Sequence, residues 1–588
     1  MLNHFSLPFE KDSEFDHSPE SIDGLSEYEK YLLSFHPERP KFLDFLSLFE
    51  DVKPCLESDA HGSYLIQSFR ADLKTKTQTI PVMLVGQQTG PTSNYKEMVE
   101  LMKNSEEVQR WNHGMPTPKS YERAFQAVKL GNKENRMILV FVDTPGADPT
   151  EESEAGGIAW RIGNTIQALT ESTTPTIAVI LNRGCSGGAI ALTGCDTVLA
   201  LENSTYLVIT PEACSSILFH TRNRANEAAE ASQITSKEGL IHGIVDELIP
   251  EPKGPAHRFP DDTIQSTYHI ISKWVDRLST FSKNTIFKSR INRWEKIGHW
   301  ARATEKEINS LQNKKNHLPH ANSEGFIPRH KDCYDSNGMR KYDPVYFTSL
   351  EKNNYICKTC GYRYARPSLW EYMEMILDVD SFSEHESTRF IIDKDILGFP
   401  GYKEKLKDTR KKTGLASAMV TGNGTVMNMP VVYCGTEFGF LGGSYCMSSG
   451  EKIWQAAKIS LKEKCPMVIQ TCGGGARMHE GCSSMVSIPK AHIALTQVEN
   501  TGIPVITIIT DPTLGGVAIG IGSRGNRIFE ANAGNIGFSG RRVIEQYVGH
   551  SLPADFQTTP WLTKNGHVEH SVSMYGLRKK IGEILNRK

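Results

Sequence analysis

A run of glycines in the C-terminal half carries the residues best suited to chemistry. Residues 471–481 read TCGGGARMHEG, and they follow a short apolar segment, 466–470, that has the length of a buried strand. Apolar residues at near-helical spacing come next. Glycine lacks a Cβ, so the backbone of such a turn can approach a ligand closely, and the first helical amides have no intrahelical acceptor. The turn is therefore a candidate oxyanion hole; a plain strand-to-helix connection is the alternative.

The same order of elements recurs along the chain, which favours the functional interpretation. An apolar segment leads into a turn in each case, and a helical pattern follows. The other examples are 503–510 (IPVITIIT) before 511–517, 137–142 (MILVFV) before 143–147, and 176–181 (TIAVIL) before the GCSGGA of 184–189. We expect two copies of one α/β unit, with glycine turns at the strand ends where ligands bind in α/β folds.

Other segments predict the elements that surround these turns. Residues 28–48 have apolar residues at helical spacing, interrupted at Pro37 and Pro40. Residues 64–86 are rich in strand formers, and 263–312 read as one long helical region. That last region carries a basic stretch, for which we consider a solvated helix face and contact with ligand phosphates. Its members are Lys283, Lys288, Arg290, Arg293 and Lys296.

Size and composition bound the class of protein. A chain of 588 residues is long enough for two or three domains. With 66 basic and 68 acidic residues, it has no overall charge that would favour nucleic acid or a membrane surface. The first residues lack the pattern of a signal peptide, and no apolar run reaches membrane-spanning length. Twelve cysteines in so long a chain fit a reducing compartment, so we expect a cytoplasmic protein.

Changes in composition predict the domain boundaries. We expect a disordered arm, a first α/β domain, a polar linker, a small cysteine-containing module and a second α/β domain. These correspond to residues 1–25, 26–310, 311–328, 329–365 and 366–588.

The small module has the ligand types of a structural zinc site. Cys357 and Cys360 form a C-x2-C knuckle, and His330 and Cys333 lie upstream. One imidazole and three thiolates suit tetrahedral Zn²⁺. The alternative is a degenerate ribbon that has lost its metal.

Many ordered motifs resemble one family, the carboxyltransferase of bacterial acetyl-CoA carboxylase. The first half resembles its alpha subunit at 36–40, 114–118, 143–147, 186–189, 204–206, 211–212 and 247–252. The second half resembles its beta subunit, zinc ribbon included, at 399–403, 412–415, 420–422, 440–444, 450–452, 474–481, 511–516 and 537–546. The resemblance implies a crotonase-superfamily fold in each half, with the zinc ribbon between them.

The resemblance also implies a reaction. The carboxyl group would move from carboxybiotin, held on a separate biotin carboxyl carrier protein, to acetyl-CoA or a related acyl-CoA, giving malonyl-CoA for fatty acid or polyketide synthesis. Biotin itself would accept the α-proton, so the protein would need two oxyanion holes rather than a strong base. We find no biotinyl-lysine motif and no ATP-binding segment, so a separate biotin carboxylase is expected as a partner. The family suggests an α2β2-like homodimer of fused chains.

By resemblance, the glycine turns supply the site residues. Gly187 and Gly188 of the first half, with Gly474 and Gly475 of the second, would hold the thioester enolate and the biotin oxygen; which pair serves which oxygen stays open. Each half alone would lack one hole, so we expect the halves to face each other. The substrate-binding set would be Gly146, Ala147, Gly184, Ser186, Ala476, Arg477, Gly515 and Gly516. Phosphates of CoA are expected near Arg290 and Arg293, or near Arg477.

The chain departs from the family pattern at several cysteines. Cys185 replaces a glycine, Cys472 precedes the glycine triplet, and Cys446 lies in a stretch that is glycine-rich in the family. A thiolate at a helix start could be a nucleophile; a small residue filling the turn is the plainer interpretation. Pro489 should kink the helix after the second turn.

Two other functions remain open from the sequence. One is a decarboxylase or acyltransferase on the same scaffold, in a specialised pathway, that uses a cysteine. The other is a non-catalytic homologue that binds RNA or a partner protein. Intact glycine turns in both halves argue against the second.

Overall fold

A computed structural model describes most of the chain, and its elements fall into two units. The described residues are 24–56, 65–311, 325–329, 333–335, 337–351, 353, 355, 357–359, 364 and 366–586. The first unit comprises Met1–Trp300, Lys394–Lys403 and Ala476–Thr496, and the second comprises Ala301–Asp393, Glu404–Gly475 and Gln497–Lys588. The predicted N-terminal arm and most of the predicted linker lie outside the described residues.

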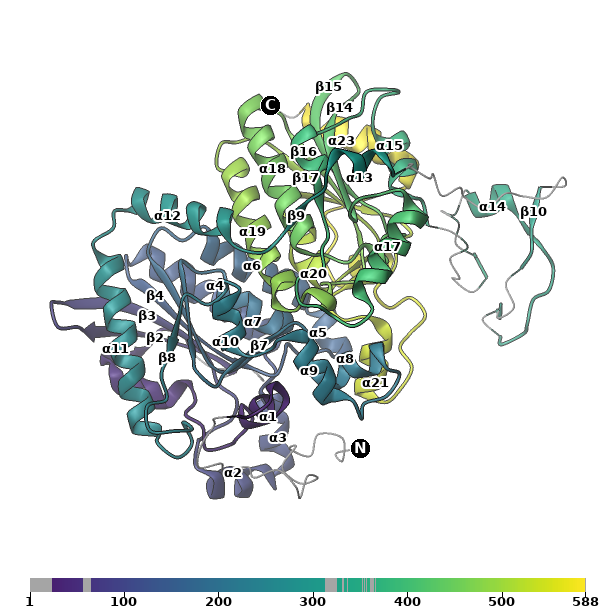
Figure 1. Cartoon of the computed structure of the whole chain (residues 1–588). Coiled ribbons are helices and arrows are strands. Elements are labelled where there is room, and N and C mark those ends of the chain that lie inside the picture. Colours follow the sequence, from purple (N-terminus) through teal and green to yellow (C-terminus); the bar gives the residue numbers. More distant parts are fainter. Residues whose placement is uncertain are drawn as a thin grey trace. The chain divides into compact units, whose positions relative to one another are not determined.

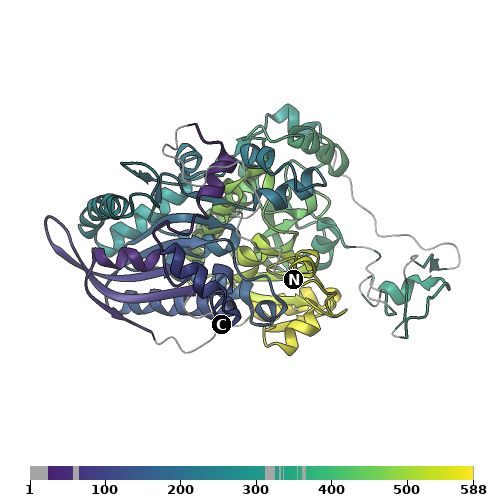
Figure 2. The same cartoon turned by 90° about the horizontal axis from the view of Figure 1, so that it is seen from below.

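The first unit is built on a mixed sheet with the order β1-β2-β3-β4-β5-β6-β8, and β7 pairs with β5. β1 to β3 are antiparallel, whereas β3 to β8 run parallel. The hairpin of β2 and β3, next to the edge strand β1, is drawn in purple (Figure 2). The strands are β1 (Glu50–Pro54), β2 (Ile66–Lys74), β3 (Thr79–Gln87), β4 (Met137–Thr144), β5 (Thr176–Cys185), β6 (Thr197–Leu201), β7 (Thr205–Leu207) and β8 (Glu247–Ile249).

Helices cover both faces of this sheet, which explains why its central strands are apolar throughout. Every residue of β4 is buried. Alternate residues of β4, β5 and β6 pack with η3 (Phe42–Leu48) and α11 in one core cluster (Figure 1). The helices are α1 (Glu27–Leu33), α2 (Tyr95–Met102), α3 (Ser105–Trp111), α4 (Pro118–Lys133), α5 (Glu151–Ala155), α6 (Ile158–Thr170), α7 (Ser186–Thr193), α8 (Pro211–Leu218), α9 (Ala225–Ser232), α10 (Ser236–Ile241), α11 (Pro260–Ser279) and α12 (Lys283–Lys296).

Two predicted helical regions each divide into separate helices, a break that the sequence predicted only for residues 28–48. The region 263–312 is not one helix, because α11 ends at Ser279 and α12 begins at Lys283, where Ser282 caps the new helix by accepting from the Thr285 N–H. Residues 28–48 form α1 and the 3-10 helix η3 rather than a continuous helix. Pro37 and Pro40 lie between them, and proline cannot donate the hydrogen bonds that a continuous helix needs.

The second unit repeats the topology of the first, as the sequence predicted. Its main sheet has the order β12-β14-β15-β16-β17-β18-β20, and β19 pairs with β17. Its first pairs are antiparallel and the rest parallel. The strands are β12 (Ser383–Glu384), β14 (Met419–Val426), β15 (Met429–Thr436), β16 (Met467–Gly473), β17 (Val505–Leu514), β18 (Asn526–Glu530), β19 (Ile536–Gly537) and β20 (His570–Val572).

The remaining elements complete the second half of the chain. Helix α19 continues through Pro489. In the described part, every helix is too short or too polar to traverse a lipid bilayer. The helices are α13 (Glu305–Asn309), α14 (Phe347–Glu351), α15 (Leu369–Ile376), α16 (Glu386–Arg389), α17 (Tyr402–Thr413), α18 (Met447–Glu463), α19 (Cys482–Glu499), α20 (Gly515–Ile519), α21 (Arg541–Val548), α22 (Thr559–Lys564) and α23 (Leu577–Leu585). The small strands are β9 (Ala301–Arg302), β10 (Phe326–Ile327), β11 (Val345–Tyr346) and β13 (Ile391–Ile392).

Candidate active site

The first glycine turn forms where the loop after β4 meets the start of α7. A Cβ added to Gly188 would lie 2.7 Å from the backbone N of Ala147 and 2.8 Å from the carbonyl carbon of Gly146, so only glycine permits this approach. Ser186 adopts a φ of 54°, which turns the chain sharply from β5 into α7. Gly184 packs its bare Cα against Tyr206, where a Cβ would come within 2.8 Å of the ring. The structure thus brings the predicted first-half residues together.

The backbone amides of this first turn are available to a ligand. Among the described residues, the N–H groups of Ala147, Gly187 and Gly188 donate to no protein acceptor, as expected for the first turn of a helix. The Gly146 N–H instead donates to the Thr144 hydroxyl at 3.2 Å. The two loops therefore offer three amides without a protein acceptor beside the close approach of Gly188 to Ala147.

Two side chains that sequence reasoning missed hold this turn in place. Gln87 Nε2 donates to the carbonyl oxygen of Gly188 at 2.9 Å, and the Tyr121 hydroxyl donates to the same oxygen at 3.3 Å. Both side chains are fully buried. Gln87 stands in the polar run 87–90 before a helical segment, a position that gives no sign of this long-range contact.

The second glycine turn has the same construction in the second unit. The loop after β16 meets the start of α20, and a Cβ on Gly515 would lie 3.4 Å from the Cα of Gly475. Behind it, a Cβ on Gly443 would lie 2.0 Å from the Cys472 carbonyl oxygen, and a Cβ on Gly473 would lie 2.2 Å from that of Gly443. These contacts bind the loop to the 440–444 motif through backbone atoms alone.

The amides of the second turn differ from expectation at Gly474. Its N–H donates to the carbonyl oxygen of Gly442 at 3.0 Å, so the amide is occupied within the protein. In the described part of the unit, the N–H groups of Gly475, Gly515 and Gly516 donate to no protein acceptor. Gly475 is the member of the predicted catalytic pair that has its donor free. No local pattern could reveal the Gly442 contact, because it joins separate segments.

Arg477, predicted to bind substrate, is instead buried in the first unit. It is 2% exposed, and its Nη1 donates to the Tyr402 hydroxyl at 3.3 Å and lies 3.7 Å from Glu480. The Tyr402 hydroxyl in turn donates to Glu480 at 2.9 Å. Glu480 thus compensates the charge of Arg477 within the protein, and binding of CoA phosphates by Arg477 stays a prediction. Ala476 begins this segment of the first unit.

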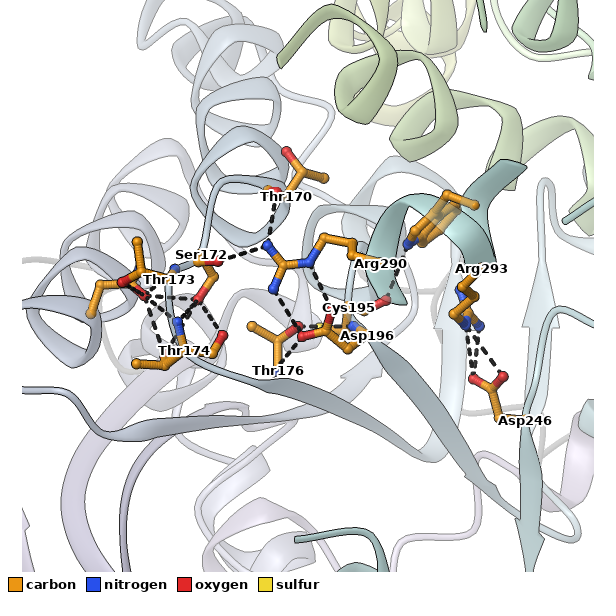
Figure 3. A network of polar contacts seen from close by, with 12 residues as sticks. Thr170, Ser172, Thr173, Thr174, Thr176, Cys195, Asp196, Asp246, Arg290 and Arg293 are labelled. Atoms are coloured by element: carbon orange, nitrogen blue, oxygen red, sulfur yellow. Dashed lines mark hydrogen bonds and ion pairs between the residues drawn. The ribbon is translucent and has the colours of Figure 1, made fainter. Parts of the chain in front are cut away.

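The prediction that Arg290 and Arg293 form a phosphate-binding surface is wrong. Arg290 is fully buried, pairs with Asp196 at 2.8 Å and donates to the carbonyl oxygens of Thr170 and Ser172 (Figure 3). Arg293 pairs with Asp246 at 2.8 Å. The remaining members of the stretch, Lys283, Lys288 and Lys296, are exposed, as the plain interpretation predicts.

The cysteines beside the turns are unsuited to act as nucleophiles. Burial, opposed by Arg183 and aided by Glu212, raises the pKa of the Cys185 thiol to about 12. Burial also raises the pKa of Cys472, which is 2% exposed. Cys446 is buried and donates to Asp393 at 3.3 Å. The reactive form of a cysteine is the thiolate, so Cys185 and Cys472 are held in the unreactive form, whereas Cys446 takes part in a buried polar contact.

The cysteine module is described only in part. Cys333 and Cys357 are buried, and their sulfurs lie 3.8 Å apart. Two thiolates bound at about 2.3 Å to a tetrahedral zinc ion lie about 3.8 Å from each other, so the pair fits this metal. Arg329 Nη1 donates to Cys333 at 3.2 Å and to Cys357 at 3.6 Å, so one cation lies against both sulfurs. His330 and Cys360 lie outside the described residues.

Comparison with known proteins matches each half of the chain separately. Residues 11–298 match the family described as acetyl co-enzyme A carboxylase carboxyltransferase-like, and residues 367–560 match the carboxyl transferase domain. The N-terminal half is 34% identical over 281 residues to the acetyl-coenzyme A carboxylase carboxyl transferase subunit alpha of Chlorobium phaeovibrioides, covering 47% of this chain and 80% of that protein. The C-terminal half is 36% identical over 246 residues to the beta subunit of Clostridium kluyveri, covering 41% of this chain and 82% of that protein.

Solved structures give a weaker similarity. A Pseudomonas malonate decarboxylase MdcD-MdcE heterodimer aligns with 19% identity and a TM-score of 0.29, covering 37% of this chain and 85% of that one. This likeness is too low to bear on the activity of the chain.

Proposed function

Because the chain belongs to the acetyl-CoA carboxylase carboxyltransferase family, with alpha-like and beta-like halves fused in one chain, it is a carboxyl-transferring enzyme, and we propose that its acceptor is acetyl-CoA. The donor is carboxybiotin on a separate carrier protein, charged by a separate biotin carboxylase, and the product is malonyl-CoA. When bound, biotin supplies both the carboxyl group and the nitrogen that accepts the α-proton. One C–N bond breaks and one C–C bond forms, so carboxyl group and proton are exchanged.

The observation that carries this proposal is the pair of glycine turns with unoccupied amides. In the first unit these are the N–H groups of Ala147, Gly187 and Gly188, and in the second those of Gly475, Gly515 and Gly516. Acyl enolates and ureido oxygens both gain negative charge during the transfer. Fixed backbone donors stabilise such charge without reorganising, and loss of one donor costs about 3 kcal/mol in other enzymes.

The two turns divide the work between the two substrates. One turn holds the enolate oxygen of the thioester, and the other holds the ureido oxygen of biotin. This division explains why the family uses two related halves and why the buried thiols of Cys185 and Cys472 have no chemical part. The amide of Gly474 supports the second turn through Gly442 instead of contacting substrate.

A structural zinc ion is the remaining element of the proposal. His330, Cys333, Cys357 and Cys360 would hold one Zn²⁺, and the 3.8 Å separation of the two described sulfurs supports this assignment. Zinc would be bound with the folding of the small module. Elemental analysis should find about one zinc per chain, and the Cys333→Ser variant should lose it; a wild-type value near zero would refute the assignment.

The reverse reaction tests the proposed activity most simply. Purified protein, malonyl-CoA and biocytin should yield acetyl-CoA and carboxybiocytin, at a rate that depends on both substrates. A Gly188→Ala variant should be slower by about 10²- to 10³-fold in the same assay. Failure of the wild-type chain with malonyl-CoA, methylmalonyl-CoA and longer acyl analogues would overturn the proposed function.

A further inference from the structure

A fully buried ion pair lies beneath the first glycine turn. Arg39 contacts Glu251 through two hydrogen bonds, of 2.8 and 3.2 Å, and neither side chain has any exposed area. The Glu251 carboxylate also accepts two backbone hydrogen bonds, from the Ala256 N–H at 2.7 Å and from the Asn203 N–H at 3.3 Å. Removing two charges from water costs free energy that their mutual attraction offsets. Loss of either partner would therefore leave an uncompensated buried charge.

The pair is connected to the ends of two strands. Arg39 Nε donates to Asn182 Oδ1 at 2.8 Å, and Asn182 Nδ2 donates to Asp143 Oδ2 at 3.0 Å. Asn182 belongs to β5 and Asp143 to β4. Asp143 precedes the loop of Gly146 and Ala147, and Asn182 precedes the start of α7. The network therefore ties the two strands together just before the two loops that meet at the turn.

The last link reaches the turn itself. The Asp143 N–H donates to Gln87 Oε1 at 3.1 Å, and the other end of that amide donates to the carbonyl oxygen of Gly188 at 2.9 Å. Gln87 is the final residue of β3. The Gly188 carbonyl shares one rigid peptide plane with the Ala189 N–H, so holding its oxygen orients that peptide unit in the first turn of α7 and, through the adjoining backbone, restrains the amides of Gly187 and Gly188. The chain of contacts is continuous from Glu251 to the Gly188 carbonyl oxygen.

We propose that Arg39, Asn182 and Gln87 are positioning residues that aim the amides of the first turn at the substrate oxygen. The inference rests on the proposed function for its effect on catalysis. Arg39 fixes the position of Asn182, and Asn182 fixes that of Asp143. Gln87 hydrogen-bonds to both Asp143 and Gly188, so it links this arrangement to the glycine turn. None of these side chains contacts substrate in this account.

The same strand provides a matched control at its opposite end. Arg290 is buried as completely as Arg39 and also makes a charge-assisted pair, with Asp196. Asp196 accepts from the backbone N–H of Thr176, the first residue of β5, at 2.8 Å (Figure 3). That pair lies at the amino end of β5, whereas the glycine turn follows the carboxyl end. Equal damage to the two pairs should therefore have unequal effects on catalysis.

The experiment compares Arg39→Lys with Arg290→Lys and adds Gln87→Met, which removes the last link alone. We expect both lysine variants to lower the melting temperature. Only Arg39→Lys and Gln87→Met should lower kcat of the reverse transfer at least tenfold with KM for malonyl-CoA within twofold, since they misplace donors that act in the transition state. Arg290→Lys should keep kcat within twofold.

Amide hydrogen exchange gives a readout that does not depend on activity. Exchange in helix α7 should accelerate in Arg39→Lys and Gln87→Met and stay unchanged in Arg290→Lys. Equal acceleration in all three variants, or in none, would overturn the positioning network. If exchange behaves as expected but the wild-type chain transfers no carboxyl group, the proposed function fails and the network stands.

Discussion

The two glycine turns share a topology but are supported by different chemistry. Beneath the first turn lies the charged network of Arg39, Glu251 and Asp143, whose members are nearly all inaccessible to solvent. Behind the second turn, Gln470 accepts from the Thr436 N–H at 3.0 Å, and the Thr471 hydroxyl donates to the Ile508 carbonyl at 3.0 Å. The second support consists mainly of neutral groups and close backbone contacts. Its one charged pair among the described residues, Arg366 and Asp511 at 3.5 Å, is looser than the first and partly open to solvent.

The difference shows that backbone geometry, rather than a particular set of side chains, is what the two units have in common. In each unit a strand-end loop touches the first turn of a helix through a glycine. A charged support makes the first turn depend on every partner, because a buried charge without its partner is strongly destabilising. A neutral support makes the second turn tolerant of polar substitutions but intolerant of any added Cβ at Gly443.

The largest effects should come from adding one methyl group to the tight glycines. Gly188→Ala would place its Cβ 2.7 Å from the Ala147 nitrogen, and Gly443→Ala would place it 2.0 Å from the Cys472 carbonyl. Both loops must shift, so we expect transfer rates to fall by about 10²- to 10³-fold. Gly474→Ala is the matched control, since its nearest contact would be 3.8 Å away. Equal losses in all three variants would contradict this account of the turns.

A substitution beneath the first turn should lower the free energy of unfolding more than one beneath the second turn does. Arg39→Met leaves Glu251 buried without its partner and should cost about 3–5 kcal/mol. Thr471→Val removes two neutral hydrogen bonds, to the Ile508 carbonyl oxygen and the Thr513 hydroxyl, and should cost about 2 kcal/mol. Urea unfolding followed by fluorescence measures both changes. If Thr471→Val lowered the free energy of unfolding as much as Arg39→Met does, the contrast between charged and neutral support would be contradicted.

Acid should weaken the first support selectively. His257 stacks on His36 with ring centroids 3.9 Å apart, and burial, with the nearby cations Arg39 and Arg258, lowers its pKa from 6.5 to about 4. Between pH 6.5 and pH 4, His257 is protonated in the unfolded chain but neutral in the folded chain. The free energy of unfolding is therefore unaffected by His257 above pH 6.5 and decreases as the pH falls toward 4. This decrease should reach about 2 kcal/mol at pH 5.

Replacing His257 by phenylalanine tests this effect. The variant should lose less thermal stability between pH 7.5 and pH 5 than the wild-type chain does. An unchanged pH dependence would show that His257 does not make the first support acid-sensitive.

The smallest effect should come from the cysteines that flank the turns. Cys185→Ala and Cys472→Ala should each keep the transfer rate within about twofold, because burial holds both thiols in the neutral form. The reverse reaction measures this directly. A loss greater than tenfold in either variant, without unfolding, would restore the cysteine-based mechanism.

The sequence predicts the repeated units and their turns because those features are local. Apolar segments followed by glycines determine where strands end, and their repetition along the chain predicts the duplicated sheets. The Gly442–Gly474 hydrogen bond and the contacts of Gln87 and Arg39 join distant segments, so no local pattern indicates them. Arg290 and Arg477 illustrate the same limit, since charge alone does not distinguish a ligand-binding arginine from one buried against Asp196 or Glu480.

Replacing single backbone amides by esters tests the central claim most directly, because it removes one N–H and leaves every side chain in place. The amide of Gly188 or of Gly516 would be exchanged in otherwise wild-type protein. We predict that each ester lowers biotin-dependent transfer by about 10²- to 10³-fold. Only the ester in the thioester turn should also lower the biotin-independent decarboxylation of malonyl-CoA. Rates within twofold of wild type for both esters would contradict the claim that backbone amides hold the two oxyanions.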